Sequence, residues 1–221
     1  MRNSRGNSSD ATGLREQNKL DKLRRIKEAA RHLFARNGFD RATTRAIARR
    51  AGVGLGTLFN YAGDKRDLVF LIFIEELDRV ADRAFAAVNP RAPLLDQLTA
   101  AFARYYRAFG SNTRLARILL QELTFYSSGK LAADFQRSRR RTIGFIETLV
   151  ARAQQAGLAR AGIDAGEAAR SIFFIYAGAV RWWIASDRSH PGRGVLELRK
   201  LLDLHIAGLA PRAVRPGRRP R

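Results

Sequence analysis

Hydroxyl, amide and cationic side chains gather between Thr43 and Lys65, in the stretch TTRAIARRAGVGLGTLFNYAGDK. Such groups hydrogen-bond to phosphate oxygens and to the edges of bases. The three histidines, His32, His190 and His205, instead lie far apart in sequence without the spacing of metal ligands. The chain also lacks a glycine-rich phosphate loop following a strand. We therefore expect no catalytic residues, no metal site and no cofactor, and we look for a binding function.

The same stretch has the pattern of two short helices joined by a glycine turn. Thr44 is expected to cap the first helix through its hydroxyl, and Ile47, Ala48 and Ala51 then line one face. Gly52 follows where helices commonly end at a positive φ. Leu58 and Tyr61 supply the inward face of the second helix. This is the spacing of a helix-turn-helix motif at about 43–62, whose second helix lies in the DNA major groove.

The phrase TT.AIA..AGV..GTLF.Y...K..L, with an amphipathic helix before it and a long helix after it, resembles the tetracycline-repressor (TetR) family of transcription regulators. The resemblance covers about residues 20–80. It implies an all-α protein with an N-terminal three-helix DNA-binding domain and a C-terminal helical domain for ligand binding and dimerisation. Leu55 departs from the family, which often has a polar or basic residue there. Ala62 stands where the family usually has a buried Phe, for which we expect Phe59 or Phe70 to compensate.

The match to the family motif implies DNA contacts at Thr44, Arg45, Gly54, Leu55, Gly56, Thr57, Asn60, Tyr61 and Lys65. The hydroxyls of Thr44 and Tyr61 and the charge of Lys65 suit phosphate oxygens, which position a protein without reading sequence. Gly54 and Gly56 would let the recognition helix approach the duplex and expose the amides at its positive end.

Arg45, Thr57 and Asn60 are the candidates for reading base edges. Arginine suits guanine, asparagine suits adenine, and the threonine methyl can touch thymine. An alternative for Asn60 is an exposed polar residue without a role, and for Tyr61 it is core packing.

Composition favours a polyanionic partner. The net charge is +21, and the first 65 residues carry 15 basic against six acidic side chains. Nucleic acid is the first candidate and an anionic membrane surface the second. A coding bias towards arginine is an alternative origin of this charge. The absence of cysteine suits a reducing compartment. With no secretory signal and no apolar run near the ~20 residues of a membrane span, we expect a soluble, cytoplasmic protein.

We expect four segments along the chain. They are a disordered basic arm at 1–19, the DNA-binding domain at 20–80, a helical effector-binding and dimerisation domain at 81–210, and a disordered basic tail at 211–221. Apolar periodicity predicts helices at about 21–37, 64–88, 94–110, 113–127, 131–156, 166–186 and 194–208.

Aromatic and apolar residues cluster on two of the expected body helices. As a ligand pocket we predict Phe102, Tyr105, Tyr106, Phe109, Leu119, Leu123, Phe125 and Tyr126, joined by Phe145 and Phe174. The tyrosine hydroxyls would orient a small ligand in a mostly apolar cavity. Ordinary core packing is the alternative for each residue alone. The arginine run at 137–141 could hold an acidic ligand, but a solvated helix face explains it as well.

The last two expected helices predict a homodimer. Their interface residues would be Ile172, Phe173, Tyr176, Val180, Trp183, Leu198, Leu201, Leu202 and His205. Two helices from each subunit would form a four-helix interface. Two recognition helices would then read successive major grooves of a roughly palindromic operator.

The sequence thus predicts a transcriptional regulator that binds double-stranded DNA. We expect a repressor that leaves its operator when a small, largely apolar or aromatic effector binds. The alternative is an architectural DNA-binding protein without a ligand, which a body packed too tightly for a cavity would favour. Neither the effector nor the operator follows from the sequence.

Overall fold

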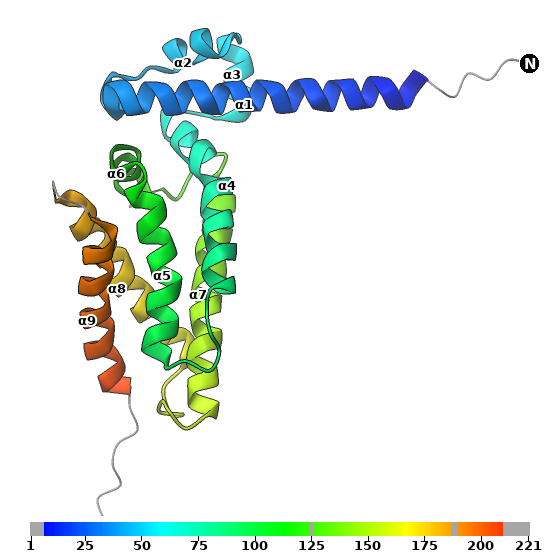
Figure 1. Cartoon of the computed structure of the whole chain (residues 1–221). Coiled ribbons are helices and arrows are strands. Elements are labelled where there is room, and N and C mark those ends of the chain that lie inside the picture. The colour runs from blue at the N-terminus through cyan, green and yellow to red at the C-terminus, as the bar shows by residue number, and fades with distance from the viewer. Residues whose placement is uncertain (1–6, 124–125, 187–189, 210–221) are drawn as a thin grey trace, which may run out of the picture. The chain divides into compact units, whose positions relative to one another are not determined.

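The computed structural model describes residues 7–123, 126–186 and 190–209, with side chains from residue 13 onward. Within these ranges the chain forms helices and no strand, which confirms the all-α fold class (Figure 1). The helices are α1 (Asn7–Arg41), α2 (Thr44–Ala51), α3 (Leu55–Tyr61), α4 (Lys65–Ala86), α5 (Leu94–Gly110), α6 (Thr113–Glu122), α7 (Ala132–Gln155), α8 (Ala165–Ala185) and α9 (Pro191–Leu209). None of them is long and apolar enough to cross a membrane.

Most helix limits agree with the sequence, and α5 has the predicted bounds. Helix α6 is shorter than expected, because it ends at Glu122 rather than near residue 127. Helix α9 begins at Pro191, three residues before its predicted start. Proline fits the first turn of a helix because the missing N–H has no partner there.

Helix α1 overturns the expectation of a disordered arm up to residue 19. It begins at Asn7, while residues 1–6 and the expected basic tail lie outside the described residues. Leu14 and Leu20 are exposed, so the first turns form without a core. A pair between Glu16 and Lys19, three residues apart, supports the helix locally. In Figure 1 this part of α1 extends beyond α2 and α3.

Contacts divide the chain into two units. The first unit comprises residues up to 77 together with 114–136, and the second comprises 78–113 and the residues from 137 onward. The sequence placed the domain boundary near residue 80. By its contacts, however, the segment 114–136 packs with the N-terminal unit rather than with the body.

The first unit is built on the apolar stripe of α1. Ile26, Ala30 and Phe34 are fully buried and pack with Ile47 of α2 and Leu58 of α3 in one core. The helix path breaks at Gly38, whose φ of 79° is not helical, where the sequence predicts the stop. Ion pairs on the surface then join α1 to α4, from Lys27 to Glu75 and from Arg31 to Glu76.

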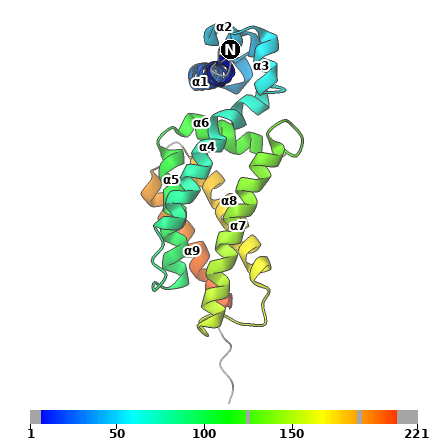
Figure 2. The same cartoon turned by 90° about the vertical axis from the view of Figure 1, so that its right-hand side faces the viewer.

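In the second unit, α9 packs against both α5 and α8 (Figures 1 and 2). Aromatic rings fill the space between α5 and α8, with Phe102 stacked on Tyr176 at 4.3 Å between ring centroids. The ring of Tyr106 lies 4.8 Å from that of Trp183, tilted by 50°. A Cβ added at Gly194 of α9 would lie 2.5 Å from the Tyr106 ring, so only glycine allows this close approach.

Candidate nucleic-acid interface and candidate effector and dimer surfaces

The first helix of the motif is capped by Thr43, not by Thr44. The Thr43 hydroxyl accepts a hydrogen bond from the amide of Ala46 at 3.1 Å. Thr44 is the first helical residue, so the capping position falls one residue earlier than expected. This correction leaves the hydroxyl of Thr44, which is half-buried, available for a phosphate.

The turn between α2 and α3 is fixed by glycine geometry. Gly52 has φ 63° and ψ 39°, the left-handed conformation that glycine adopts without a steric penalty. Its amide donates to the carbonyl of Arg49 at 3.2 Å, and the amide of Val53 donates to that of Ala48 at 3.1 Å. This pair of bonds is the Schellman motif, which ends a helix and reverses the chain.

Helix α3 places the predicted DNA contacts at the surface of the first unit. Its Leu58 is buried. None of the nine predicted contact residues is buried: four are exposed, namely Arg45, Gly54, Gly56 and Asn60, and five are half-buried, namely Thr44, Leu55, Thr57, Tyr61 and Lys65. Gly54 precedes the helix without a side-chain cap. The arrangement can offer hydroxyls, an amide and cations to a duplex.

Two of these residues already have partners within the chain. The Tyr61 hydroxyl donates to the carbonyl of Lys19 at 3.2 Å, so its single hydrogen cannot also reach a phosphate. The Lys65 ammonium donates to the carbonyls of Phe39 and Asp40 at 3.0 and 3.4 Å. It also lies 4.3 Å from the centroid of the Phe39 ring. Because an ammonium has three donors, Lys65 keeps one for a phosphate.

The core next to Ala62 differs from the expectation. Ala62 is fully buried, but Phe59 is 36% exposed and does not compensate for the missing aromatic ring. Phe70 is buried and stacks on Tyr126, with 3.7 Å between ring centroids. Of the two residues expected to compensate, only Phe70 contributes to the core.

A buried carboxylate, which the sequence analysis missed, lies at the start of α4. Asp67 is 1% exposed and accepts hydrogen bonds from the amides of Gly63 and Lys130 at 2.7 and 3.2 Å. It also accepts a hydrogen bond from the hydroxyl of Tyr126. Burial and then Asp67 raise the pKa of Tyr126. In the sequence, Gly129 is the residue that could have indicated this site. Its φ is 147°, and a Cβ there would lie 2.6 Å from the carboxylate.

The segment after α6 is bonded to the recognition helix and to α4. The Lys130 ammonium donates to the carbonyl of Phe59 on α3. Arg66 of α4 forms an ion pair with Glu122 at 2.8 Å and donates to its carbonyl at 3.0 Å. These bonds lie within the first unit, so the end of α6 and the recognition helix share one set of contacts.

The predicted pocket residues are divided between the two units. Those of α5 are buried. Among them, Tyr105 hydrogen-bonds with Thr142 at 3.2 Å, whereas the hydroxyl of Tyr106 has no partner among the described residues. Burial raises the pKa of both tyrosines. Leu119, Leu123 and Tyr126 belong to the other unit.

Three further pocket predictions have separate outcomes. Phe125 lies outside the described residues. Phe145 is half-buried and stacks on Phe85 at 4.0 Å. Phe174 is 65% exposed on α8 rather than buried with the α5 residues, and its place in a ligand pocket stays a prediction. Helix α8 is apolar nearly all round, so its sequence does not tell which face points inward.

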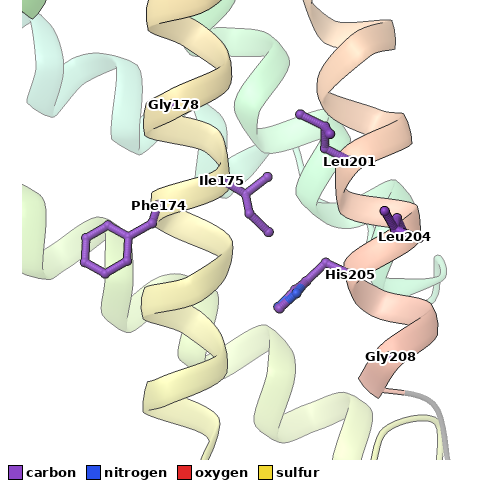
Figure 3. A pocket seen from close by; sticks show the side chains of 7 residues that line it. All are labelled: Phe174, Ile175, Gly178, Leu201, Leu204, His205 and Gly208. Atoms are coloured by element: carbon purple, nitrogen blue, oxygen red, sulfur yellow. The ribbon is translucent and has the colours of Figure 1, made fainter.

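An apolar hollow of about 510 Å³ lies between α8 and α9 (Figure 3). Figure 3 shows Ile175 and His205 directed into the space between the two helices. The Nε2 atom of His205 is buried and has no hydrogen-bond partner among the described residues. The hollow is lined by Phe174, Ile175, Gly178, Leu201, Leu204, His205 and Gly208.

The predicted dimer interface consists mostly of residues that are buried within the single chain. Six of its residues are buried inside the single chain, namely Ile172, Tyr176, Val180, Trp183, Leu198 and Leu202. Leu201 is exposed, and Phe173 and His205 are half-buried. The uncovered face instead presents large apolar side chains at Phe174, Trp182, Leu201 and Leu204. We call these four residues the apolar face.

The arginine run on α7 has mixed surroundings. Arg141 forms an ion pair with Asp82. Arg139 is half-buried, and burial followed by the nearby charge of Arg181 lowers its pKa. Burial also lowers the pKa of Arg181 on α8. Two guanidinium groups that repel each other in a partly desolvated place favour a nearby anion.

Comparison with known proteins extends these observations. Residues 26–72 match the family described as bacterial regulatory proteins, tetR family. The fatty acid metabolism regulator protein of Bacillus subtilis (strain 168) is 23% identical over 184 residues, which are 81% of this chain and 94% of that protein. An HTH-type transcriptional regulator of Staphylococcus aureus (strain USA300) is 37% identical over 54 residues, 24% of this chain and 29% of that protein.

Solved structures share the fold. The transcriptional repressor FadR of Thermus thermophilus, in complex with lauroyl-CoA, has a TM-score of 0.66 at 22% identity, covering 90% of this chain and 99% of that one. FadR of Bacillus subtilis, in complex with stearoyl-CoA, has a TM-score of 0.67 at 22% identity, covering 84% and 98%.

The helix-turn-helix, the all-α fold and the family match define a class of DNA-binding regulators rather than of enzymes. Residues 26–72 thus form a DNA-binding domain of the TetR family, and most of the chain is similar to a regulator protein.

Proposed function

We propose that the protein is a homodimeric repressor of the cytoplasm that binds a roughly palindromic operator and leaves it when an effector binds. The single observation that carries this proposal is the helix-turn-helix, with all nine predicted contact residues outside the core. Base reading falls to Arg45, Thr57 and Asn60, and phosphate contact to Thr44 and Lys65. The bond from Tyr61 to Lys19 makes Tyr61 a weaker candidate for phosphate.

A second copy of the chain is the proposed partner of the apolar face. Trp182 and Leu204 are 80% and 77% exposed, and the hollow beside them is lined by apolar side chains. Monomeric proteins rarely leave large contiguous apolar patches open to water. A two-fold axis would pair the same face of each copy and give the two recognition helices their spacing along the duplex.

We propose a long-chain acyl thioester of coenzyme A as the effector. Support comes from the lauroyl-CoA and stearoyl-CoA complexes of the two FadR proteins. The half-buried Arg139 and Arg181 suit phosphate groups. The stacked aromatic rings between α5 and α8 would have to separate to admit the acyl chain. This replaces the smaller effector expected from the sequence. The bonds from Glu122 and Lys130 to α4 and α3 supply a path from α6 to the recognition helix.

The first test of DNA binding is a mobility-shift titration of the purified protein on the DNA upstream of its own gene. We expect a sharp complex that survives excess non-specific competitor and added salt. Smeared, salt-labile binding to every duplex would instead contradict the operator proposal and favour the architectural alternative.

The effector is tested by adding lauroyl-CoA or stearoyl-CoA to the preformed operator complex, with free coenzyme A and the free fatty acid as controls. We expect only the thioesters to weaken operator binding, by roughly 5- to 150-fold, the usual range of coupling between two sites. An Arg181→Gln variant should need more thioester for the same release, while Arg140→Gln, on the exposed side of α7, should not. Equal release by wild type and Arg181→Gln would contradict the arginine site.

A further inference from the structure

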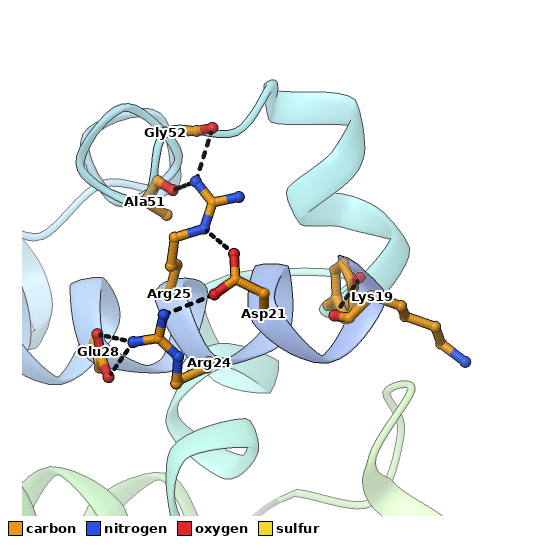
Figure 4. A network of polar contacts seen from close by, with 8 residues as sticks. Lys19, Asp21, Arg24, Arg25, Glu28, Ala51 and Gly52 are labelled. Carbon is orange, nitrogen blue, oxygen red and sulfur yellow. Dashed lines mark hydrogen bonds and ion pairs between the residues drawn. The ribbon is translucent and has the colours of Figure 1, made fainter. Parts of the chain in front are cut away.

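Helix α1 is bonded to both ends of the segment that carries the recognition helix. At one end, Nη1 of Arg25 donates to the carbonyl of Ala51 at 3.0 Å and lies 3.5 Å from that of Gly52. At the other end, the Tyr61 hydroxyl donates to the carbonyl of Lys19. Figure 4 shows Arg25 reaching from α1 to the turn between α2 and α3. The same stretch of α1 therefore contacts the chain just before and at the end of α3.

The guanidinium meets carbonyls that the helix itself does not use. The last carbonyls of a helix lack amide partners within the helix, and the partial negative charge at the C-terminal end of a helix attracts a cation. The Schellman turn satisfies Ala48 and Arg49, which leaves the carbonyls of Ala51 and Gly52 for Arg25. A single side chain thus binds two carbonyls at the end of α2.

Asp21 fixes the position of this guanidinium. Its Oδ2 forms an ion pair with Nε of Arg25 at 3.0 Å, while its Oδ1 accepts from Arg24 at 2.6 Å (Figure 4). The hydrogen bond from Arg24, followed by smaller contributions from Arg25, holds the pKa of Asp21 below its usual range. Arg24 itself turns to Glu28 and does not reach the turn. Asp21 therefore stays ionised at neutral pH and orients Arg25.

The turn also leaves room for Arg25. A Cβ added at Gly52 would lie 3.1 Å from Nη1 of Arg25, closer than side-chain carbons normally approach. A side chain at this position would displace the guanidinium by a few tenths of an ångström, in addition to the strain of a positive φ. Helix α3 has only seven residues and no side-chain cap, so its orientation depends on such outside contacts.

We propose that Arg25, oriented by Asp21, is a positioning residue for DNA recognition. Together with the Lys19 carbonyl, it fixes α3 against α1 in the orientation that base reading requires, without itself touching DNA. Preorganised recognition groups bind better because less ordering remains for the moment of binding. The proposal rests on the function proposed above, in which α3 reads the operator.

The test compares operator binding with binding to a scrambled duplex of equal length, for the full chain and its variants. The operator is the duplex selected by wild-type protein. We expect Arg25→Ala to lower operator affinity roughly tenfold, the size of one charge-assisted hydrogen bond, and to leave scrambled binding within about twofold. Arg25→Lys should recover part of the loss. Lys22→Ala, a control on the exposed side of α1 outside this network, should bind the operator as wild type does.

The dependence on salt separates positioning from direct contact. A positioning residue leaves the slope of log affinity against log salt unchanged, whereas a lost phosphate contact lowers it by about one. A lowered slope, or unchanged operator affinity in Arg25→Ala, would overturn the proposal. If Arg25→Ala does not fold, Arg25→Lys and Asp21→Asn replace it in the test. A selective loss of operator affinity in both variants supports the proposal, and wild-type affinity in both overturns the proposal. Wild type that does not prefer any operator overturns the proposed function as well.

Discussion

The helix pairs α2–α3 and α8–α9 each leave one face uncovered. The face of α2–α3 carries polar groups, whereas that of α8–α9 carries apolar side chains. Around α2–α3, polar groups of α1 and of the segment after α6 bond to backbone carbonyls, as Arg25 does to Ala51 and Lys130 to Phe59. Between α8 and α9, apolar side chains surround a hollow, and Nε2 of His205 has no hydrogen-bond partner among the described residues. Contacts within one chain stabilise the first region, which we call the braced region, whereas the second leaves large apolar side chains exposed.

The largest effect should come from placing a charge on the apolar face. We expect Leu204→Asp to raise the dimer dissociation constant by roughly 100-fold or more, because an unpaired charge buried in an interface costs several kcal/mol. Sedimentation equilibrium measures this constant. Leu158→Asp is the control, since Leu158 is 68% exposed but does not line the hollow. If Leu204→Asp remained as dimeric as the control, the second copy would not lie on this face.

Removing the Tyr126 hydroxyl should weaken the braced region. Tyr126→Phe takes one donor from the buried carboxylate of Asp67, which costs about 1–3 kcal/mol of unfolding free energy in urea. Tyr105→Phe is the comparison, because its partner Thr142 is neutral, and we expect about 1 kcal/mol. A larger loss for Tyr105→Phe would mean that Asp67 does not anchor the first unit.

The same hydroxyl predicts a loss of stability in alkali. Burial and Asp67 raise the pKa of Tyr126 above its usual value of 10. Above pH 10 the unfolded chain therefore releases a proton that the folded chain keeps, so the unfolding free energy falls as the pH rises. Tyr126→Phe should lose less stability than wild type between pH 9 and 11. Equal slopes in both proteins would contradict this cause.

On the outward side of the braced region, Asn60→Ala should relax the choice of base at one operator position. The discrimination lost there should be about 1–3 kcal/mol, with other positions unchanged. Selection from randomised duplexes measures the preference at each position. An unaltered pattern would leave Asn60 as an exposed polar residue without a role in reading.

The smallest effect should come from Lys65→Ala. Loss of one phosphate contact weakens binding to all sequences alike and lowers the salt slope by about one. Lys22→Ala, an exposed lysine of α1, is the control. Unchanged affinity and slope in Lys65→Ala would show that the motif is aligned wrongly.

Local signals made most of the fold predictable. Gly52 marked the turn, and Asp64 caps α4 by accepting a hydrogen bond from the amide of Asp67 at 2.8 Å. The helix limits followed from apolar periodicity because one face of most helices is buried. The family motif supplied the DNA contacts, which remain predictions.

Features that depend on partners distant in sequence were not predictable. Asp67 meets Tyr126 and Lys130 only after folding, and nothing at its own position indicates a buried carboxylate. Helix α8 is apolar on both sides, so its sequence could not separate Tyr176, which packs inward, from Phe174, which does not. The early turns of α1 also lacked an apolar stripe, so a helix without a core was read as disordered.

The most direct test of the account compares a full operator with a single half-site, using wild type and Leu204→Asp. If the recognition region is complete in one chain and the apolar face joins two chains, wild type should bind the full operator far more tightly than the half-site. Leu204→Asp should bind both duplexes alike, with wild-type affinity for the half-site. A variant that kept the preference for the full operator would contradict the account, because two heads would then cooperate without this face.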